Sequence, residues 1–165
     1  GDLSTGKSDA RYASKWLSLI FRLVLTLHYR NNLCMTQKSN KTIISTPNSP
    51  AAIGAYSQAV LVNDTLYVSG QIPLDPKTME TVEGDFEAQA RQVFENLSAV
   101  LVAANCQWSQ VVKLNVYMLD LNMFAKLNEV MSEYVAEPYP ARAAVGVASL
   151  PKGVAVEMDA VMELD

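Results

Sequence analysis

Two segments of this sequence repeat apolar residues at the spacing of an amphipathic helix, and they limit most strongly what the chain can fold into. In residues 85–104 the apolar side chains recur every three or four positions, and Asp85 is a candidate N-cap. The second segment follows Asp120 and ends before Pro138, because proline cannot continue a helix. Each helix has one apolar face, which must pack on another layer of structure. The sequence therefore predicts a domain in which two helices cover a sheet.

Six further segments have the composition of β-strands. Residues 56–62 and 65–72 flank Asn63 and Asp64, a two-residue turn signal, and are predicted to form a hairpin. The predicted strands are, in chain order, residues 42–45, 56–62, 65–72, 111–119, 141–148 and 154–164. The order βββαβαββ predicts an α+β fold, with one sheet and both helices packed on one of its faces.

The last predicted strand indicates what covers the opposite face of the sheet. Strand side chains alternate, so one face of this segment presents Ala155, Glu157, Asp159 and Val161. This set is too mixed for a hydrophobic core and too apolar for ordinary solvent-facing surface. It predicts that the outer face of the sheet is an interface between subunits.

Another predicted strand carries a single arginine among small residues. Because side chains alternate, Arg142, Ala144 and Gly146 share one face. We expect this face to line a gap that contains the guanidinium, and the opposite face to be the core side. The expected core residues are Ala143, Val145 and Val147. A guanidinium suits bidentate binding of a carboxylate or phosphate, from a ligand or from a neighbouring acidic side chain at the sheet edge.

The residue types present exclude several kinds of chemistry. His28, the only histidine, precedes the predicted domain, which therefore has no imidazole for a catalytic triad or for most transition-metal sites. Cys34 and Cys106 are far apart and lack metal-binding spacing, which excludes a zinc site or disulfide framework and favours a reducing compartment. Cys106 is predicted to be a small buried side chain. Acid–base chemistry must use carboxylates, hydroxyls, backbone groups or water.

The charge is distributed unevenly along the chain. Residues 1–34 contain five basic and two acidic residues, whereas the rest of the chain contains eight basic and 15 acidic residues. An acidic domain binds nucleic acid poorly, because that binding depends on lysine and arginine neutralising phosphates. We therefore expect no nucleic-acid partner.

We divide the chain into an N-terminal extension, residues 1–40, and one domain, residues 41–165. The apolar stretch at residues 16–27 is too short and too interrupted to span a membrane. The extension is either a sequence added upstream in cloning or gene prediction, or a targeting segment. The expected location is the cytoplasm, or the mitochondrion if the extension is a genuine presequence.

Five separated motifs occur in order along the predicted domain. They are AAIGAYSQA at 51–59, VSGQIP at 68–73, VK at 112–113, PAR at 140–142 and LP at 150–151. Together they resemble the RidA (YjgF-type) family. The resemblance implies a chorismate-mutase-like fold, a homotrimer, and ligand clefts between adjacent subunits. It also implies hydrolysis of 2-imino acids and 2-aminoacrylate-type enamines to 2-oxo acids and ammonia, with no cofactor and no metal.

The resemblance also implies roles for individual residues. Arg142 is expected to hold the substrate carboxylate, and Glu157 to position or polarise the attacking water, a task that a backbone carbonyl can also perform. Tyr56 is expected to line the cleft and to act with these two in catalysis. Further substrate contacts are implied at Ser69, Gly70 and Asn128.

Each of these residues also has a structural alternative. Tyr56 can be a core or interface aromatic, and Ser69 with Gly70 can form a bulge in an edge strand. Glu157 can neutralise a cation across an interface, and Asn128 can be ordinary polar helix surface.

The chain departs from the family pattern at three positions. Ala144 and Gly146 replace a cysteine and a glutamate that deaminase-active members often carry, and Ala55 replaces a common proline. We expect a roomier and less polar cleft, with a changed substrate size or a lower turnover.

Two classes of function follow from these observations. The first is an imine and enamine deaminase, whose substrates arise from PLP-dependent dehydratases acting on serine or threonine. The alternative is a non-catalytic trimer that binds small carboxylates such as 2-oxo acids and signals to a partner. A ribonuclease or translation inhibitor is disfavoured, because RNA cleavage usually needs a basic groove and a general acid–base pair.

Overall fold

The computed structural model describes residues 40–164 of this 165-residue chain. The expectations for the N-terminal extension, including those that involve His28 and Cys34, therefore lie outside the described residues. No helix within residues 40–164 is long and apolar enough to cross a membrane.

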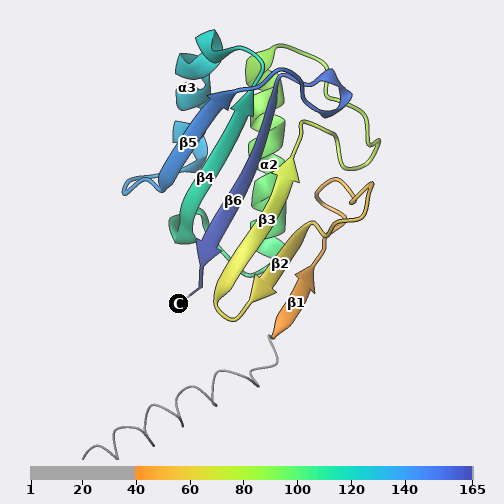
Figure 1. Cartoon of the computed structure of the whole chain (residues 1–165), viewed down its shortest axis with the longest axis vertical. Coiled ribbons are helices and arrows are strands. Elements are labelled where there is room, and N and C mark those ends of the chain that lie inside the picture. Colours follow the sequence, from red (N-terminus) through yellow and green to blue (C-terminus); the bar gives the residue numbers. More distant parts are fainter. Residues whose placement is uncertain (1–39, 165) are drawn as a thin grey trace, which may run out of the picture. The chain divides into compact units, whose positions relative to one another are not determined.

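Six strands form one mixed sheet in the order β1-β2-β3-β6-β4-β5 (Figure 1). Their bounds are β1 Lys41–Ile44, β2 Ala59–Val62, β3 Thr65–Gln71, β4 Val111–Met118, β5 Ala141–Gly146 and β6 Val156–Glu163. Neighbouring strands are antiparallel except β4 and β5, which are parallel. The sheet is thus built around β6, which pairs with both β3 and β4.

Two helices, α2 (Phe86–Ala103) and α3 (Phe124–Tyr134), cover one face of this sheet (Figure 1). Asp85 caps α2 by accepting a hydrogen bond from the Ala88 backbone N–H at 3.1 Å. A 3-10 turn at Leu121–Met123, capped by Asp120, leads into α3. The α+β fold with one sheet and two helices on one face is confirmed.

Two element boundaries differ from prediction for local reasons. The helix α3 ends before Val135, whose backbone is extended and whose side chain is buried in the core, rather than running on to Pro138. The strand β2 begins only at Ala59, because Tyr56 lies in a bend where its N–H donates to the Gly54 carbonyl at 2.9 Å.

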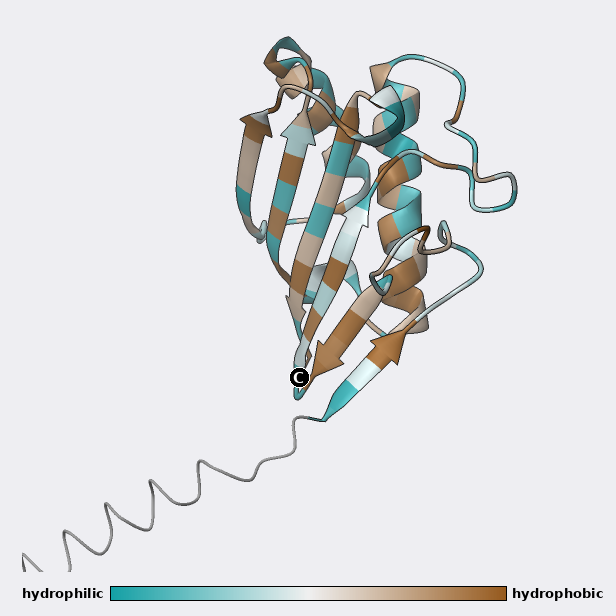
Figure 2. Cartoon of the chain, turned by 45° about the vertical axis from the view of Figure 1, so that its right-hand side comes forward, coloured by the Kyte–Doolittle hydropathy of each residue, from teal (hydrophilic) through white to brown (hydrophobic). Residues whose placement is uncertain are grey.

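The hydrophobic core lies between the sheet and the helices. In β6 every second side chain, from Val156 to Met162, is buried against this layer, and Figure 2 shows bands of hydrophobic and hydrophilic colour alternating along the strands. On α2, Phe94 and Leu97 are fully buried. Burying each such leucine or phenylalanine contributes roughly 1.5–3 kcal/mol. The Tyr134 ring stacks on Phe94 with centroids 4.9 Å apart, which joins the two helices.

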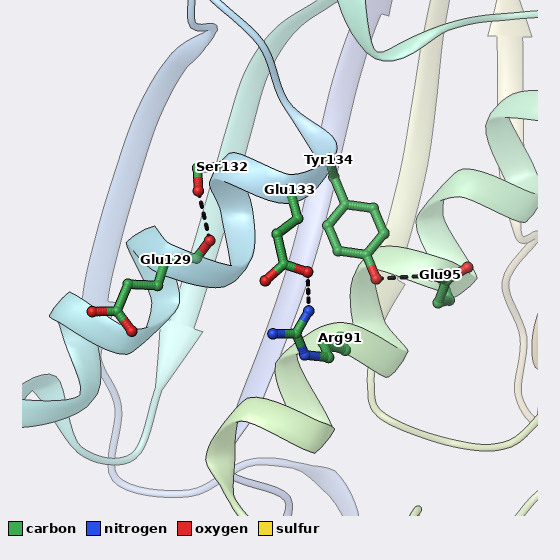
Figure 3. Close-up of polar contacts among 6 residues, drawn as sticks. All are labelled: Arg91, Glu95, Glu129, Ser132, Glu133 and Tyr134. Carbon is green, nitrogen blue, oxygen red and sulfur yellow. Dashed lines mark hydrogen bonds and ion pairs between the residues drawn. The ribbon is translucent and has the colours of Figure 1, made fainter.

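Polar contacts also connect α3 to α2 at the surface (Figure 3). Arg91 forms an ion pair with Glu133, and the Tyr134 hydroxyl donates to Glu95 Oε1 at 2.7 Å. Burial and the neighbouring Glu95 raise the pKa of Tyr134 to about 12, so this hydroxyl keeps its proton. Within α3, Ser132 donates to the Glu129 carbonyl. The exposed contacts are individually weak, and together with the stacked rings they set the position of α3 over β5.

The prediction of which face of β5 is the core side was wrong. Arg142 pairs in register with Leu114 of β4, which is fully buried beneath the helices, so the arginine points to the helix side. Ala144 packs at the edge of the core on that side, whereas Ala143 and Val145 are exposed on the other face. The alternation of side chains was correct, but β5 is an edge strand covered only by α3, which leaves room there for a long polar side chain.

The face of the sheet away from the helices carries the mixed residues predicted from the sequence. On β6, Glu157, Asp159 and Val161 are all partly buried. The Asp159 carboxylate accepts hydrogen bonds from Asn115 Nδ2 at 2.7 Å and from the Tyr117 hydroxyl at 2.9 Å. Its charge is therefore satisfied within the chain. The subunit interface expected on this face stays a prediction.

Candidate functional site

Four of the six predicted site residues lie together around an irregularity in β3. Tyr56, Ser69, Gly70 and Glu157 line one cavity of about 350 Å³. Its remaining walls are apolar and come from Ile53, Ile72 and Pro151. The register between β3 and β6 shifts between Val68 and Gln71, so Ser69 and Gly70 form a β-bulge. The bulge that the sequence offered as a structural alternative is thus part of the candidate site. We call this group of four residues the acid half-site.

Gly70 allows the Glu157 side chain to lie directly against the backbone. A Cβ atom built on Gly70 would overlap the Glu157 carboxylate. Burial, with a further contribution from the negative charge of Asp159, raises the pKa of Glu157. Within residues 40–164 no lysine or arginine forms an ion pair with this carboxylate. The structure therefore places at the cavity a carboxyl group that holds its proton more tightly than an ordinary glutamate does.

The two hydroxyl groups in this half-site differ in whether their proton is available to a ligand. Ser69 Oγ donates to the Ser57 carbonyl at 2.6 Å, so its proton is already used. The Tyr56 hydroxyl accepts a long hydrogen bond of 3.4 Å from the Ile53 N–H, which leaves its own proton to donate. The Tyr56 side chain is half-exposed. Tyr56 can therefore offer a ligand both an apolar ring and a donor.

Arg142 and Asn128 form a second group, which we call the arginine half-site. Arg142 Nη1 donates to Asn128 Oδ1 at 2.7 Å and lies 3.3 Å from the Met131 sulfur. The guanidinium carbon lies 4.8 Å from the centre of the Phe124 ring, in a cation–π contact. All three neighbours come from α3, which holds the guanidinium in one orientation.

No carboxylate occupies Arg142 in the described chain. The ion pairs within residues 40–164 involve Arg91 and Lys126, so the salt-bridged alternative for Arg142 is not formed there. The arginine instead borders a cavity of about 310 Å³, which Asn128, Ser132 and Tyr139 also line. A buried or half-buried guanidinium gains most from a charge-assisted, bidentate acceptor. This cavity can therefore take an anionic group such as a carboxylate.

The two half-sites lie on opposite faces of the sheet. Glu157 is opposite Tyr117 on β4, and Arg142 is opposite Leu114 on the same strand. Leu114 is buried beneath the helices and Tyr117 faces the other way, since the two are three positions apart along the strand and side chains alternate. Because the sheet lies between them, a single copy of the chain cannot place Arg142 and Glu157 on one small ligand.

Sequence reasoning missed several residues that shape these half-sites. Phe124 and Met131 belong to the apolar residues of the second predicted helix and carry no signal of a binding role, yet they contact the guanidinium. Leu121 lies over Gly146, where an added Cβ would come within 3.3 Å of its side chain. Ala144 and Gly146 thus sit beneath an apolar cover.

Other sequence expectations concern residues outside the half-sites. Cys106 is buried, as predicted, and burial raises the pKa of its thiol, which disfavours the reactive thiolate. In the described part of the chain, no three His, Cys, Asp or Glu side chains lie together as a metal site would require.

Comparisons with known proteins agree with this fold and these motifs. The family model described as endoribonuclease L-PSP matches residues 46–164. A 2-iminobutanoate/2-iminopropanoate deaminase of Rattus norvegicus is 48% identical over 121 residues, which cover 73% of this chain and 88% of the rat protein.

Two solved structures are similar in both sequence and shape. RidA from an Antarctic Psychrobacter is 54% identical with a TM-score of 0.72, and the match covers 74% of this chain and 99% of that one. E. coli TdcF with bound serine is 39% identical with a TM-score of 0.71, and the match covers 75% of this chain and 99% of that one. With its five motifs, its helix-covered sheet and these relatives, the chain belongs to the endoribonuclease L-PSP family, also known as the RidA/YjgF family.

Proposed function

We propose that this protein hydrolyses reactive 2-imino acids, and their enamine tautomers, to 2-oxo acids and ammonia. One observation carries the proposal. Arg142, which has no acidic partner within residues 40–164, lines a cavity on one face of the sheet, and Glu157, a carboxyl group with a raised pKa, lines a cavity on the other face. The name of the rat relative, 2-iminobutanoate/2-iminopropanoate deaminase, supports the same reaction. A site that needs both groups is completed only when two copies of the chain meet.

The substrate's chemistry matches the two half-sites. A 2-imino acid has a carboxylate next to an electrophilic C=N bond. Arg142, already oriented by Asn128 and Phe124, binds the carboxylate with two charge-assisted hydrogen bonds and so fixes the reacting carbon. Asn128 turns only its oxygen to the arginine, which leaves its amide N–H groups for the ligand.

In the proposed reaction Glu157 acts as the general base and then as the general acid. Water adds to the imine carbon and forms a C–O bond while the imine nitrogen gains a proton, which gives a carbinolamine. Glu157 takes a proton from the attacking water and returns it to the nitrogen. In the second step the carbinolamine hydroxyl gives up its proton, which passes through Glu157 to the amino group; the C–N bond then breaks, ammonia leaves, and the C–O bond becomes the carbonyl of the 2-oxo acid. A raised pKa suits a group that must both accept and donate a proton near neutral pH. Tyr56 donates from its hydroxyl, and the Ser69–Gly70 bulge, which lines the same cavity, lets the Glu157 carboxylate lie against the backbone beside the ligand.

We further propose that the protein is a homotrimer with one site at each contact between subunits. The outer face of the sheet supports association, because Tyr67, the neighbour of the partly buried Val161, and Val145 on β5 are both exposed there. In this arrangement the arginine half-site of one subunit faces the acid half-site of the next. The reaction uses water and these side chains without a cofactor, and the cysteine content favours the cytoplasm as its location.

A coupled assay tests the proposed reaction. A serine or threonine dehydratase generates the imine, and a semicarbazide trap measures how much imine survives. The wild-type protein is expected to accelerate imine loss, and Arg142→Ala and Glu157→Gln are each expected to lower this rate by about 100-fold or more. Arg91→Ala, which removes an arginine on the helix surface, is the control and should keep full activity. Acceleration that survives Arg142→Ala would contradict the proposed site.

Subunit complementation tests whether the site is shared. If each site takes Arg142 from one copy and Glu157 from another, co-refolded Arg142→Ala and Glu157→Gln chains in equal amounts regain about a quarter of wild-type activity, because chains pair at random. Co-refolding two samples of Arg142→Ala should regain nothing. An inactive mixture of correctly assembled mutants would show that the site does not lie between subunits.

Non-catalytic binding of small carboxylates is the second candidate function. It is favoured by the Arg142 guanidinium, which pairs with no carboxylate of residues 40–164, and by the serine bound to E. coli TdcF, a relative with 39% identity. Calorimetry with 2-oxobutanoate separates the two candidates when it is combined with the coupled assay. Binding that depends on Arg142, without any acceleration of imine loss, would identify the protein as a ligand-binding relative.

A further inference from the structure

We infer that Gln58, Ser49 and Gln71 are positioning residues, which form a buried hydrogen-bonded clasp that fixes the Ser69–Gly70 bulge beneath Glu157. All three side chains are at most 4% exposed. Together with Asn96 they make up the buried polar residues in the part of the chain that the structure describes. The inference rests on the proposed function only where it concerns turnover, because the geometry of the bulge can be measured separately.

Gln58 fastens the loop that precedes the acid half-site. Its Nε2 lies within hydrogen-bond distance of three backbone carbonyls, those of Thr46, Ser49 and Pro50, at 3.0, 3.1 and 2.8 Å. Its Oε1 accepts from the Thr46 N–H at 2.7 Å. A carboxamide has two N–H protons, so at least one is shared between two carbonyls. One side chain thus replaces the strand pairing that this loop lacks.

Gln71 and Ser49 continue the clasp to the bulge. Ser49 Oγ donates to Gln71 Oε1 at 3.0 Å, and Gln71 Nε2 donates to the Ser69 carbonyl at 3.1 Å. The Ser69 N–H in turn donates to the Gln58 carbonyl at 3.0 Å. The chain of contacts therefore runs from the loop through two buried side chains to the bulge and back to the backbone of Gln58.

The clasp influences the position of the Glu157 side chain by fixing the bulge against which this side chain lies. Ser69 is held by its N–H, its carbonyl and its hydroxyl, and the next residue is the glycine against which the Glu157 carboxylate lies. Every buried side-chain N or O atom among residues 40–164 has at least one hydrogen-bond partner, so no polar atom of the clasp is buried without one. A shift of the bulge moves the surface on which Glu157 rests, whereas Arg142 lies on the other face and is unaffected.

The variant Gln71→Glu tests the clasp through its pH dependence. When ionised, the new carboxylate still accepts from Ser49 but repels the Ser69 carbonyl; when protonated, it donates to that carbonyl as the amide does. Relative to wild type at the same pH, kcat is expected to fall about tenfold as pH rises from about 6 to about 9, with KM changed less than about twofold. Gln71→Met, which lacks both polar groups, should lower kcat by a similar factor at every pH.

A second readout does not depend on catalysis. Carboxyl carbon NMR follows the titration of Glu157, whose raised pKa is expected to move toward its ordinary value in Gln71→Met as the displaced bulge admits water. Ser98→Ala is the matched control: Ser98 is also a hydrogen-bonded side chain, but it lies on α2 with Phe94 and Trp108 as partners. This control should lose stability while keeping the wild-type kcat and Glu157 titration.

The two readouts separate failure of the inference from failure of the proposed function. If Gln71→Met and Gln71→Glu lower thermal stability but keep the wild-type Glu157 titration, the clasp is merely structural and the inference is overturned. If the wild-type protein hydrolyses no imine, the proposed function fails, and a shifted Glu157 titration in Gln71→Met still supports the clasp.

Discussion

Gly70 affects both the packing of the sheet and the proposed reaction. Its missing side chain is the space that the Glu157 carboxylate occupies. In Gly70→Ala the added methyl group forces Glu157 to move, and overpacking of this kind typically costs about 1–3 kcal/mol. We expect a folded protein of lower stability whose imine hydrolysis falls at least about tenfold. Thermal unfolding and the coupled assay measure the two effects, and a variant with wild-type turnover would show that Glu157 needs no contact with this backbone.

Glu157 also makes folding stability depend on pH. Its pKa is raised in the folded state, chiefly by burial and then by Asp159, so the folded protein binds this proton more tightly than the unfolded chain does. The contribution of Glu157 to stability is therefore greatest below its ordinary pKa and is lost as pH rises through the raised folded value. Over the pH interval from the ordinary pKa of glutamate to the raised folded value, the free energy of unfolding should fall less in Glu157→Gln than in wild type. Denaturant titration at several pH values measures this difference. An unchanged pH dependence would contradict the burial of this carboxyl group.

At the scale of elements, α3 prepares Arg142 for its ligand. Asn128, Met131 and Phe124 all contact the guanidinium from this helix. Asn128→Ala removes the side-chain oxygen that accepts a hydrogen bond from Arg142, worth about 1 kcal/mol, which corresponds to about a fivefold weaker binding of 2-oxobutanoate. Calorimetry measures the loss, and Lys126→Ala on the same helix serves as the control. Equal affinity in Asn128→Ala and wild type would show that β5 alone orients the arginine.

The elements also show which features could be predicted from the sequence. The helix α2 was predicted almost to the residue, because its cap at Asp85 and its apolar spacing are local signals. The core side of β5 was not predicted correctly. The alternation of side chains defines two faces of a strand but does not show which face the helices cover. That choice depends on the pairing of Arg142 with Leu114, a contact between distant residues.

The separation of the candidate site into two half-sites could not be predicted for the same reason: it depends on pairing between residues that are far apart in the sequence. The sequence motifs predicted that six residues form one site, whereas in the structure the sheet separates these residues into two half-sites. The register of β4 with β5 and with β6 shows that Arg142 and Glu157 face opposite ways. The buried positions of Gln58 and Gln71 could not be predicted either, because both are polar residues that carry no periodic signal.

At the scale of the whole molecule, association through the outer face of the sheet is open to a direct test. Val161 lies next to Tyr67 in the register of β6 and β3, on the face of the sheet away from the helices. A glutamate there would bury a charge on association, so Val161→Glu is expected to be monomeric and to lose imine hydrolysis. Light scattering after size-exclusion chromatography measures the mass. Val102→Glu, at a highly exposed position on α2, should leave both mass and activity unchanged.

The position of β6 has a consequence for how the protein is made. A ribosome synthesises this strand after the other five, yet β6 lies between β3 and β4 and carries Glu157. Until it emerges from the exit tunnel, the nascent chain consists of two separate sheet fragments, each with an unpaired inner edge. The sheet and the acid half-site are thus completed in one late step, and a prematurely terminated chain that lacks this strand has neither a continuous core nor the proposed proton-transfer group.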